Sequence, residues 1–276
     1  MKTKMKIAQS QLIVGHDKSA HADKIRNIIA EAAAQGADMI CFPEMSNCPY
    51  QTRLFVPYAE PHMGETWQLF SSLAAEHKIY VSAGSIPETG ENGKIYNTAY
   101  VFDREGKEIA KHRKMHLYDV DVKGGVSFKE SDIFEPGNEV TVFDTEFGKG
   151  GLIVCYDVRF PELTRLMLAE GMRFLVVPAA FNMTTGPLHW ELLFRSQASN
   201  NQIFTIGTAL ARDPDIAFNS WGHSIVCDPW AKVLSQADEH EALIFTEIDL
   251  DVTEQIREQM PALKHRRTDI YEVVRK

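Results

Sequence analysis

The sequence lacks the features that mark membrane-spanning, nucleic-acid-binding and repeat proteins. Its 276 residues contain no run of about 18 apolar residues, so no segment is long enough to span a bilayer as a helix. Basic side chains are not in excess, and the net charge of −9 argues against a phosphate backbone as a partner. No fixed-period repeat or low-complexity tract is present. Because 44% of the residues are apolar and no linker divides the chain, we expect a single domain over residues 1–276.

Cysteine is scarce, and its spacing indicates neither disulfides nor a metal. The 4 cysteines lie at positions 41, 48, 155 and 227. A disulfide framework needs denser spacing in a shorter chain, so we expect reduced thiols in a cytoplasmic protein. Cys41 and Cys48 have no second pair at zinc-ligand spacing. The histidines His116, His189 and His223 have no ligand cluster beside them. We therefore expect no metal and no cofactor.

Two further segments lack the pattern of a recognised motif. Lysines near the start resemble the positive end of a signal peptide, but Gln9, Ser10 and Gln11 interrupt the apolar stretch that should follow. Gly124-Gly125 is not followed by the Lys-Ser/Thr pattern of a phosphate-binding loop. We expect residues 1–15 to belong to the fold, and no nucleotide site at the paired glycines.

Apolar periodicity predicts alternating strands and helices, with several hairpins. Helices are expected at 18–35, where Asp17 can cap the first turn, and at 65–77, 161–171, 186–201 and 251–259. Strands are expected at 5–14, 38–42, 78–86, 97–103, 107–113, 150–154, 174–180, 202–210 and 242–250, with a hairpin over 222–236. Residues 115–138 carry little periodicity and read as a long functional loop. This mixture of connections predicts mixed sheets in an α/β fold.

Cys155 is the first candidate for chemistry. It ends an apolar strand and precedes a turn into a helix beginning near Pro161. Such a strand-to-helix elbow exposes a nucleophile and turns the next backbone N–H toward the substrate oxygen. A nearby helix N-terminus also favours the thiolate. The alternative is that Cys155 is a small buried apolar residue, as most free cysteines are.

Glu44 and Lys114 also lie at the ends of predicted strands. Ligands bind where strand ends gather in α/β sheets. A partly desolvated Glu44 carboxylate is a suitable general base, and the Lys114 ammonium can stabilise a developing oxyanion. Taken alone, Glu44 reads equally as a surface carboxylate and Lys114 as a solvated lysine in a basic run. The case for a site depends on Cys, Glu and Lys occurring together at three strand ends.

Three segments resemble the signature segments of the nitrilase (carbon–nitrogen hydrolase) superfamily. They are FPEM at 42–45, HRKMHL at 112–117 and VCYDVRFPE at 154–162. The resemblance covers about residues 5–272 and implies a four-layer α-β-β-α sandwich with a Glu44–Lys114–Cys155 triad at one rim. It also implies subunits that pair into a homodimer or higher oligomer, with the C-terminal tail of about 260–276 in subunit contacts.

Further segments are most similar to the ω-amidase group of that superfamily. They are NCPY at 47–50, FKES at 128–131, AFNMTTGPLHWE at 180–191, WGHS at 221–224 and HRRTDIY at 265–271. The resemblance implies hydrolysis of the ω-amides of small 2-oxo acids, chiefly 2-oxoglutaramate and 2-oxosuccinamate, through a cysteine thioester. It implies that Glu130 acts as a second glutamate that holds Lys114, with the solvated loop carboxylate as the alternative.

Two more residues are candidates for substrate binding. The backbone N–H of Tyr156 is expected to help hold the oxyanion. Arg159 is expected to grip a substrate carboxylate through two parallel hydrogen bonds. Alternatively, Arg159 forms a structural ion pair with Asp157 or Glu162.

Three other interpretations remain open. The related deaminated glutathione amidases share the last two of the ω-amidase segments and would need a longer pocket. A catalytically idle binding or scaffold protein on the same fold would be a different class of function. A nitrilase acting on nitriles is disfavoured, because those enzymes carry different residues around the cysteine.

The predicted helix at 161–170 offers an apolar stripe for subunit pairing. Leu163, Leu166 and Met167 recur at helical spacing. The alternative is that this stripe packs inside its own subunit.

Overall fold

The computed structural model describes residues 2–276, and its strands form two large sheets. In order, the first sheet contains β15 (Ala242–Asp249), β1 (Lys4–Gln11), β2 (Met39–Cys41), β4 (Tyr80–Thr89), β5 (Ile95–Phe102) and β6 (Glu108–Arg113), with β3 (Glu60–Pro61) beside β4. The second contains β14 (Val233–Gln236), β13 (Ile225–Cys227), β12 (Phe204–Ala209), β11 (Met172–Ala179), β10 (Gly148–Leu152) and β9 (Val142–Thr145). Each sheet has parallel central strands and antiparallel edges, which confirms the prediction of mixed sheets.

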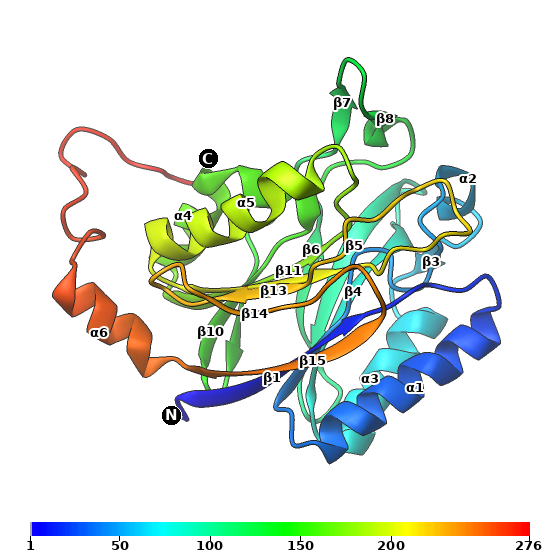
Figure 1. The fold of residues 1–276 in the computed structure, drawn as a ribbon, viewed down its shortest axis with the longest axis horizontal. Coiled ribbons are helices and arrows are strands. Elements are labelled where there is room, and N and C mark those ends of the chain that lie inside the picture. The colour runs from blue at the N-terminus through cyan, green and yellow to red at the C-terminus, as the bar shows by residue number, and fades with distance from the viewer. Residues whose placement is uncertain (1) are drawn as a thin grey trace.

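Helices cover the outer face of each sheet, which gives four layers (Figure 1). Helices α1 (Lys18–Ala34) and α3 (Glu65–His77) lie against the first sheet, and α4 (Pro161–Ala169) and α5 (Gly186–Asn201) against the second. The predicted α-β-β-α sandwich is therefore confirmed.

The alternation of side chains along β1 explains the layering. Met5 and Ile7 point between the two sheets, whereas Ala8 packs under α1 and α3. Successive residues of a strand face opposite sides, so a strand buried on both faces serves two cores. The core between the sheets continues under α4 and α5 through Trp190 and Phe194, which are both buried as the helical spacing predicts.

The predicted start of α1 is confirmed by its cap. The Asp17 carboxylate accepts hydrogen bonds from the backbone N–H groups of Ser19 and Ala20 at 2.9 and 3.1 Å. Gly36 follows the helix with φ of +75°, a conformation that favours glycine at a helix end.

The segment 115–138 differs from the prediction of a long loop. It contains a short hairpin of β7 (Asp119–Asp121) and β8 (Ser127–Lys129), followed by the single-turn 3₁₀ helix η1 (Glu130–Asp132). The hairpin projects from the body of the molecule (Figure 1). Its strands have three residues each, too few for a periodic pattern to identify them. The short helix α2 (Thr52–Phe55) escaped prediction for the same reason.

The apolar stripe predicted for subunit pairing is wrong for two of its three residues. On α4, Leu163 and Met167 are 3% and 0% exposed and belong to the apolar core that α4 forms with the second sheet. Only Leu166 is half-buried. The stripe packs largely inside its own subunit, because α4 lies flat on β11. The pairing of subunits itself stays a prediction.

The C-terminal part runs along the outside of the sandwich. Helix α6 (Asp251–Gln259) ends the regular structure, and the chain then loops away from the body before returning toward α4 (Figure 1). Ile270, Tyr271 and Val274 are 69%, 54% and 61% exposed. The predicted role of residues 260–276 in subunit contacts stays a prediction. Among residues 2–276, no helix combines the length and apolar character needed to cross a membrane.

Candidate active site

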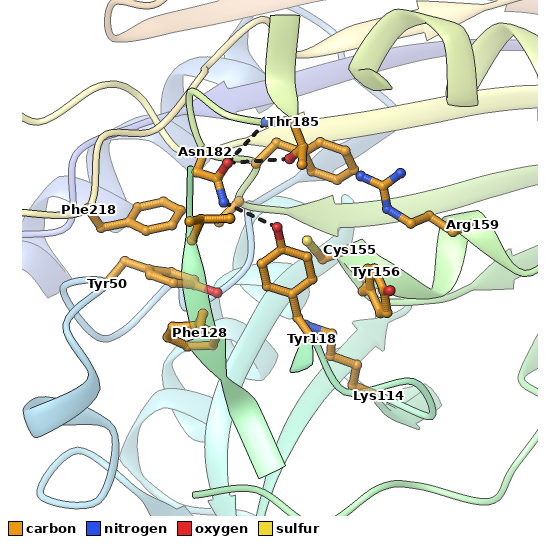
Figure 2. A pocket seen from close by; sticks show the side chains of 13 residues that line it. Tyr50, Lys114, Tyr118, Phe128, Cys155, Tyr156, Arg159, Asn182, Thr185 and Phe218 are labelled. Carbon is orange, nitrogen blue, oxygen red and sulfur yellow. Dashed lines mark hydrogen bonds between the residues drawn. The ribbon is translucent and has the colours of Figure 1, made fainter. Parts of the chain in front are cut away.

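Four side chains that the sequence singled out meet at one rim of the sandwich. Glu44 follows β2, Lys114 follows β6, Glu130 begins η1, and Cys155 begins the 3₁₀ helix η2 (Cys155–Arg159). The Lys114 ammonium donates to Glu44 Oε1 at 3.0 Å and to Glu130 Oε1 and Oε2 at 3.0 and 2.8 Å. Lys114 and Cys155 both line one pocket (Figure 2). The structure thus brings together residues that are up to 111 positions apart, counted from Glu44 to Cys155 (155 − 44).

The charged members of this group are withdrawn from solvent. Glu44, Lys114 and Glu130 are 0%, 1% and 1% exposed. The alternatives of a surface carboxylate, a solvated lysine and a solvated loop glutamate are therefore wrong. A buried charge is tolerated only when it is paired and hydrogen-bonded, and this cluster provides both conditions.

A close approach between two backbones positions Glu44. Gly84 of β4 has φ of +71°, and a Cβ there would lie 2.0 Å from the carbonyl oxygen of Pro43. Only glycine permits this contact. The turn that follows is pinned by Ser85, whose hydroxyl accepts a hydrogen bond from the Met45 N–H at 3.2 Å.

Sequence reasoning missed Asn97, a fully buried residue of β5. Its amide nitrogen donates to Glu44 Oε1 at 2.8 Å and to Glu130 Oε1 at 3.2 Å. Its backbone oxygen accepts from the Lys114 N–H at 2.8 Å. Asparagine is disfavoured in strand interiors, so its presence in the predicted strand 97–103 was the available signal. Asn97 connects both glutamates to the lysine.

Burial and charge change the protonation of the cluster. Burial raises the pKa of the Glu44 carboxyl, and the Glu130 charge raises it further, while Lys114 opposes both. For Lys114, burial lowers the ammonium pKa, but Glu130, Glu44 and Cys155 outweigh this effect and hold the pKa well above its ordinary value. Two carboxylates around one ammonium carry an excess negative charge, which adds to the effect of burial in raising the pKa of Glu44.

The thiol of Cys155 is not the ready thiolate that the sequence predicted. Burial raises its pKa well above the ordinary value, and the Glu44 charge adds to this effect, while Lys114 and a backbone hydrogen bond from Ala180 oppose it. The residue is 7% exposed. Cys155 is itself the first residue of the five-residue 3₁₀ helix η2, and the longer helix α4 begins only at Pro161, so the dipole stabilisation expected of a longer helix is small. Cys155 adopts φ of +46°, as a sharp strand-to-helix elbow requires.

The pocket above Cys155 has mainly aromatic walls. Its empty volume is about 440 Å³, and its lining includes Tyr50, Tyr118, Phe128, Tyr156, Phe181 and Phe218. In Figure 2, Tyr50 and Phe218 lie on one side of Cys155 and Arg159 lies on the other. Tyr118 also connects the aromatic wall of the pocket to the buried charged cluster, because its backbone N–H donates to Glu130 Oε2 at 2.6 Å. No local sequence pattern predicts this role, because a tyrosine in a loop has no fixed meaning.

Arg159 lines the pocket without an ion-pair partner among residues 2–276. Its predicted alternative partner Asp157 instead accepts hydrogen bonds from His112 and His116, so the structural ion pair with Asp157 is wrong. The guanidinium contacts His189 Nδ1 at 3.2 Å, and its Nε has no hydrogen-bond partner. The pKa of His189 is lowered by burial and by the Arg159 charge.

The histidines named in the sequence have ordinary polar partners. His116 contacts Asp157, His189 contacts Arg159, and the His223 ring contacts the backbone oxygen of Trp221 at 2.7 Å. Within residues 2–276, no group of three or more His, Cys, Asp or Glu side chains has an arrangement that could hold a metal ion. All four cysteines are free and buried.

Comparisons with known proteins agree on one family. A family profile described as carbon-nitrogen hydrolase matches residues 6–258. A hydrolase of Schizosaccharomyces pombe is 46% identical over 98% of this chain and 84% of its own length. Omega-amidase NIT2 of Mus musculus is 44% identical over 97% of each chain. The crystal structure of Saccharomyces cerevisiae Nit3, a member of branch 10 of the nitrilase superfamily, superposes with a TM-score of 0.89 at 38% identity, covering 96% of this chain and 97% of that one. The chain therefore belongs to the carbon–nitrogen hydrolase family, within the nitrilase superfamily.

Proposed function

We propose that this enzyme is an ω-amidase, which hydrolyses the ω-amide of small 2-oxo dicarboxylic acid monoamides to the acid and ammonia. 2-Oxoglutaramate and 2-oxosuccinamate are the proposed substrates. The name of the mouse relative supports the reaction class. The observation that carries the choice of substrate is the pocket, where Cys155 lies beside a Glu–Lys–Glu cluster and Arg159 has no carboxylate partner among residues 2–276.

Acylation begins with transfer of the thiol proton to Glu44. The Oε2 atom of Glu44 is buried and, within residues 2–276, has no geometric hydrogen-bond partner, so it can accept this proton from Cys155, with which the Glu44 carboxyl interacts. The sulfur of Cys155 attacks the amide carbon as the proton leaves, because a thiol of raised pKa supplies little free thiolate. Lys114 and the backbone N–H of Tyr156 stabilise the oxyanion.

The same carboxyl group completes both halves of the reaction. Protonated Glu44 gives its proton to the amide nitrogen, the carbon–nitrogen bond breaks, and ammonia leaves behind a thioester on Cys155. Glu44 then takes a proton from water as the water oxygen attacks the thioester carbon. The thioester bond breaks, the sulfur recovers the proton from Glu44, and the acid leaves. A carboxyl of raised pKa suits this alternation of base and acid.

Glu130 is proposed to hold Lys114 rather than to exchange protons. Both of its oxygens accept from the Lys114 ammonium, and Oε2 also accepts from the Tyr118 N–H. With its acceptors occupied, Glu130 keeps the ammonium fixed beside the reacting carbonyl.

The dimensions of the pocket favour a short substrate over deaminated glutathione. The Tyr50 and Phe218 rings lie with centroids 4.1 Å apart at an interplanar angle of 31° and close the side opposite Arg159. We propose that a 2-oxo acid of four or five carbons binds between Arg159 and Cys155, whereas a tripeptide-sized amide would have to displace this wall. The presence of Glu44, Lys114 and Cys155 together at the pocket opposes the second interpretation, an idle binding protein on the same fold.

Ammonia release from a panel of short amides tests the proposal. We expect the 2-oxo ω-amides to be hydrolysed with the highest kcat/KM, above amides of the same length that lack the 2-oxo or carboxylate group. Faster hydrolysis of deaminated glutathione than of 2-oxoglutaramate would favour the alternative amidase. Absence of ammonia from every amide would contradict an amidase role for the pocket.

Subunit pairing is proposed from the family resemblance. With Leu163 and Met167 in the core, the stripe on α4 no longer supports it, so the prediction rests on the resemblance alone. Light scattering across micromolar concentrations should give the mass of at least a dimer. A monomer throughout that range would contradict the predicted pairing of subunits.

A further inference from the structure

One carboxylate holds both histidines that flank Lys114 in the sequence. Asp157 Oδ2 contacts His112 Nε2 at 3.1 Å, and Oδ1 contacts His116 Nδ1 at 2.7 Å. Asp157 also accepts from the backbone N–H of His116 at 2.9 Å and from that of Val154 at 3.1 Å. Four N–H donors therefore surround a side chain that is 0% exposed.

These contacts join the segment that carries the lysine to the segment that carries the cysteine. His112, Lys114 and His116 are spaced two residues apart at the end of β6. Asp157 lies two residues after Cys155 in η2. The contacts of Asp157 with the two histidines connect the first sheet to the second. They hold the backbone on both sides of Lys114 against the segment that contains Cys155.

Each histidine is held from a second side. His112 is 0% exposed, and its Nδ1 contacts the Thr141 hydroxyl at 3.0 Å. The His116 ring stacks on Phe160 with centroids 3.6 Å apart and an interplanar angle of 8°. Neither ring can rotate without losing these contacts, so the position of each N–H is well defined.

We infer that Asp157, His112 and His116 form a brace that sets the position of the Lys114 ammonium relative to the Cys155 sulfur during turnover. All three act as positioning residues, since the pocket lining includes none of them. The inference deepens the proposed function and rests on it for the reaction that Lys114 assists. A displacement of about 1 Å at a preorganised charge is enough to reduce turnover by about 100-fold.

The charge on Asp157 is maintained by the brace. Burial would raise the pKa of its carboxyl, but the hydrogen bonds from His112 and His116 hold the pKa well below the ordinary value. The carboxylate stays ionised over the working pH range and accepts all four N–H groups at once. Its contribution to stability is present above the pKa of the unfolded chain and is lost only as the pH falls through the lower folded value.

Isosteric substitutions test whether the N–H groups of His112 and His116 position Lys114 through their hydrogen bonds to Asp157. Asparagine places an amide nitrogen near the Nδ1 position of His116, and glutamine places one near the Nε2 position of His112. We expect His116→Ala and His112→Ala to lower kcat by about 10- to 100-fold with KM changed less than about threefold. His116→Asn and His112→Gln should recover most of that loss. Asparagine and alanine both lack the ring that stacks on Phe160, so their comparison isolates the N–H.

A second readout does not depend on the substrate. The Lys114 charge lowers the pKa of the Cys155 thiol. If the brace loosens, the lysine moves away, so the pH profile of Cys155 alkylation by iodoacetamide should shift to higher pH in His116→Ala and return in His116→Asn. His77→Ala, on α3 and outside the pocket lining, is the matched control and should leave the profile unchanged.

The outcomes separate the brace from the proposed function. Unchanged kcat and an unchanged alkylation profile in folded His116→Ala and His112→Ala would overturn the brace, as would equal losses in His116→Ala and His116→Asn. If 2-oxo amides are not hydrolysed by the unaltered enzyme, the proposed function fails. The alkylation profiles would still decide whether the brace positions Lys114.

Discussion

The base and the wall of the pocket are built differently. The base consists of Glu44, Lys114, Glu130 and Asn97, which are at most 1% exposed and are held by hydrogen bonds of 2.8–3.2 Å. The wall consists of aromatic rings from loops and the β7–β8 hairpin, and Arg159 has, within the described residues 2–276, a side-chain hydrogen bond only with His189. Strand ends hold the base rigidly, while loops can vary at low cost to the fold. We therefore propose that the base supplies the chemistry and that the wall selects the substrate.

The largest effect should come from Cys155, the proposed nucleophile, which lies beside the base. Cys155→Ala should reduce turnover by at least about 1,000-fold on every amide, while the melting temperature changes little. Cys41→Ala, Cys48→Ala and Cys227→Ala remove buried thiols outside the pocket lining and should keep most activity. A comparable loss of activity in one of these three variants would show that the nucleophile has been assigned to the wrong thiol.

A change of charge in the base should alter the pH profile. The negative charge of Glu130 raises the pKa values of Glu44 and Lys114, so Glu130→Gln should lower both. Glu44 must be ionised to accept the thiol proton, and Lys114 must stay protonated. Both limbs of the kcat/KM profile should therefore move to lower pH, with a loss of about 10- to 100-fold at the optimum. An acidic limb that moved to higher pH would contradict the arrangement of charges.

A change in the wall should discriminate between substrates. Arg159→Lys keeps the charge but loses the planar pair of hydrogen bonds. We expect kcat/KM for 2-oxoglutaramate to fall by about 10- to 100-fold, equivalent to about 1.4–3 kcal/mol, with a much smaller change for an uncharged amide of similar length. The measurement is the ratio of the two kcat/KM values before and after substitution. An unchanged ratio would remove Arg159 from substrate binding and leave the base unaffected.

The smallest effect should come from shortening the far wall. Phe218→Ala removes one ring of the Tyr50–Phe218 stack and enlarges the side opposite Arg159. Longer ω-amides should gain about fivefold in kcat/KM relative to 2-oxoglutaramate, which is the low end of the about 1–3 kcal/mol by which one methylene in an apolar pocket discriminates. A uniform loss on short and long amides would show that this wall does not limit length.

Local pattern was sufficient for much of the fold. The helices at 65–77, 186–201 and 251–259 begin and end where periodicity predicts, because they are long enough to repeat an apolar face. Short elements such as β7, β8 and α2 contain no repeat of apolar residues, so periodicity did not predict them.

What the sequence alone determined is the identity of the reactive groups. Glu44, Lys114 and Cys155 follow apolar strands in recognisable segments, and strand ends gather at one rim in an α/β fold. Tertiary structure decided how those groups behave. Burial turned Cys155 from an expected thiolate into a thiol of raised pKa and made Lys114 a buried cation. The tertiary structure also pairs Asp157 with two histidines through hydrogen bonds and buries Leu163 and Met167 in the core. These outcomes depend on desolvation and on contacts between distant segments, and neither is encoded in the spacing of neighbouring residues.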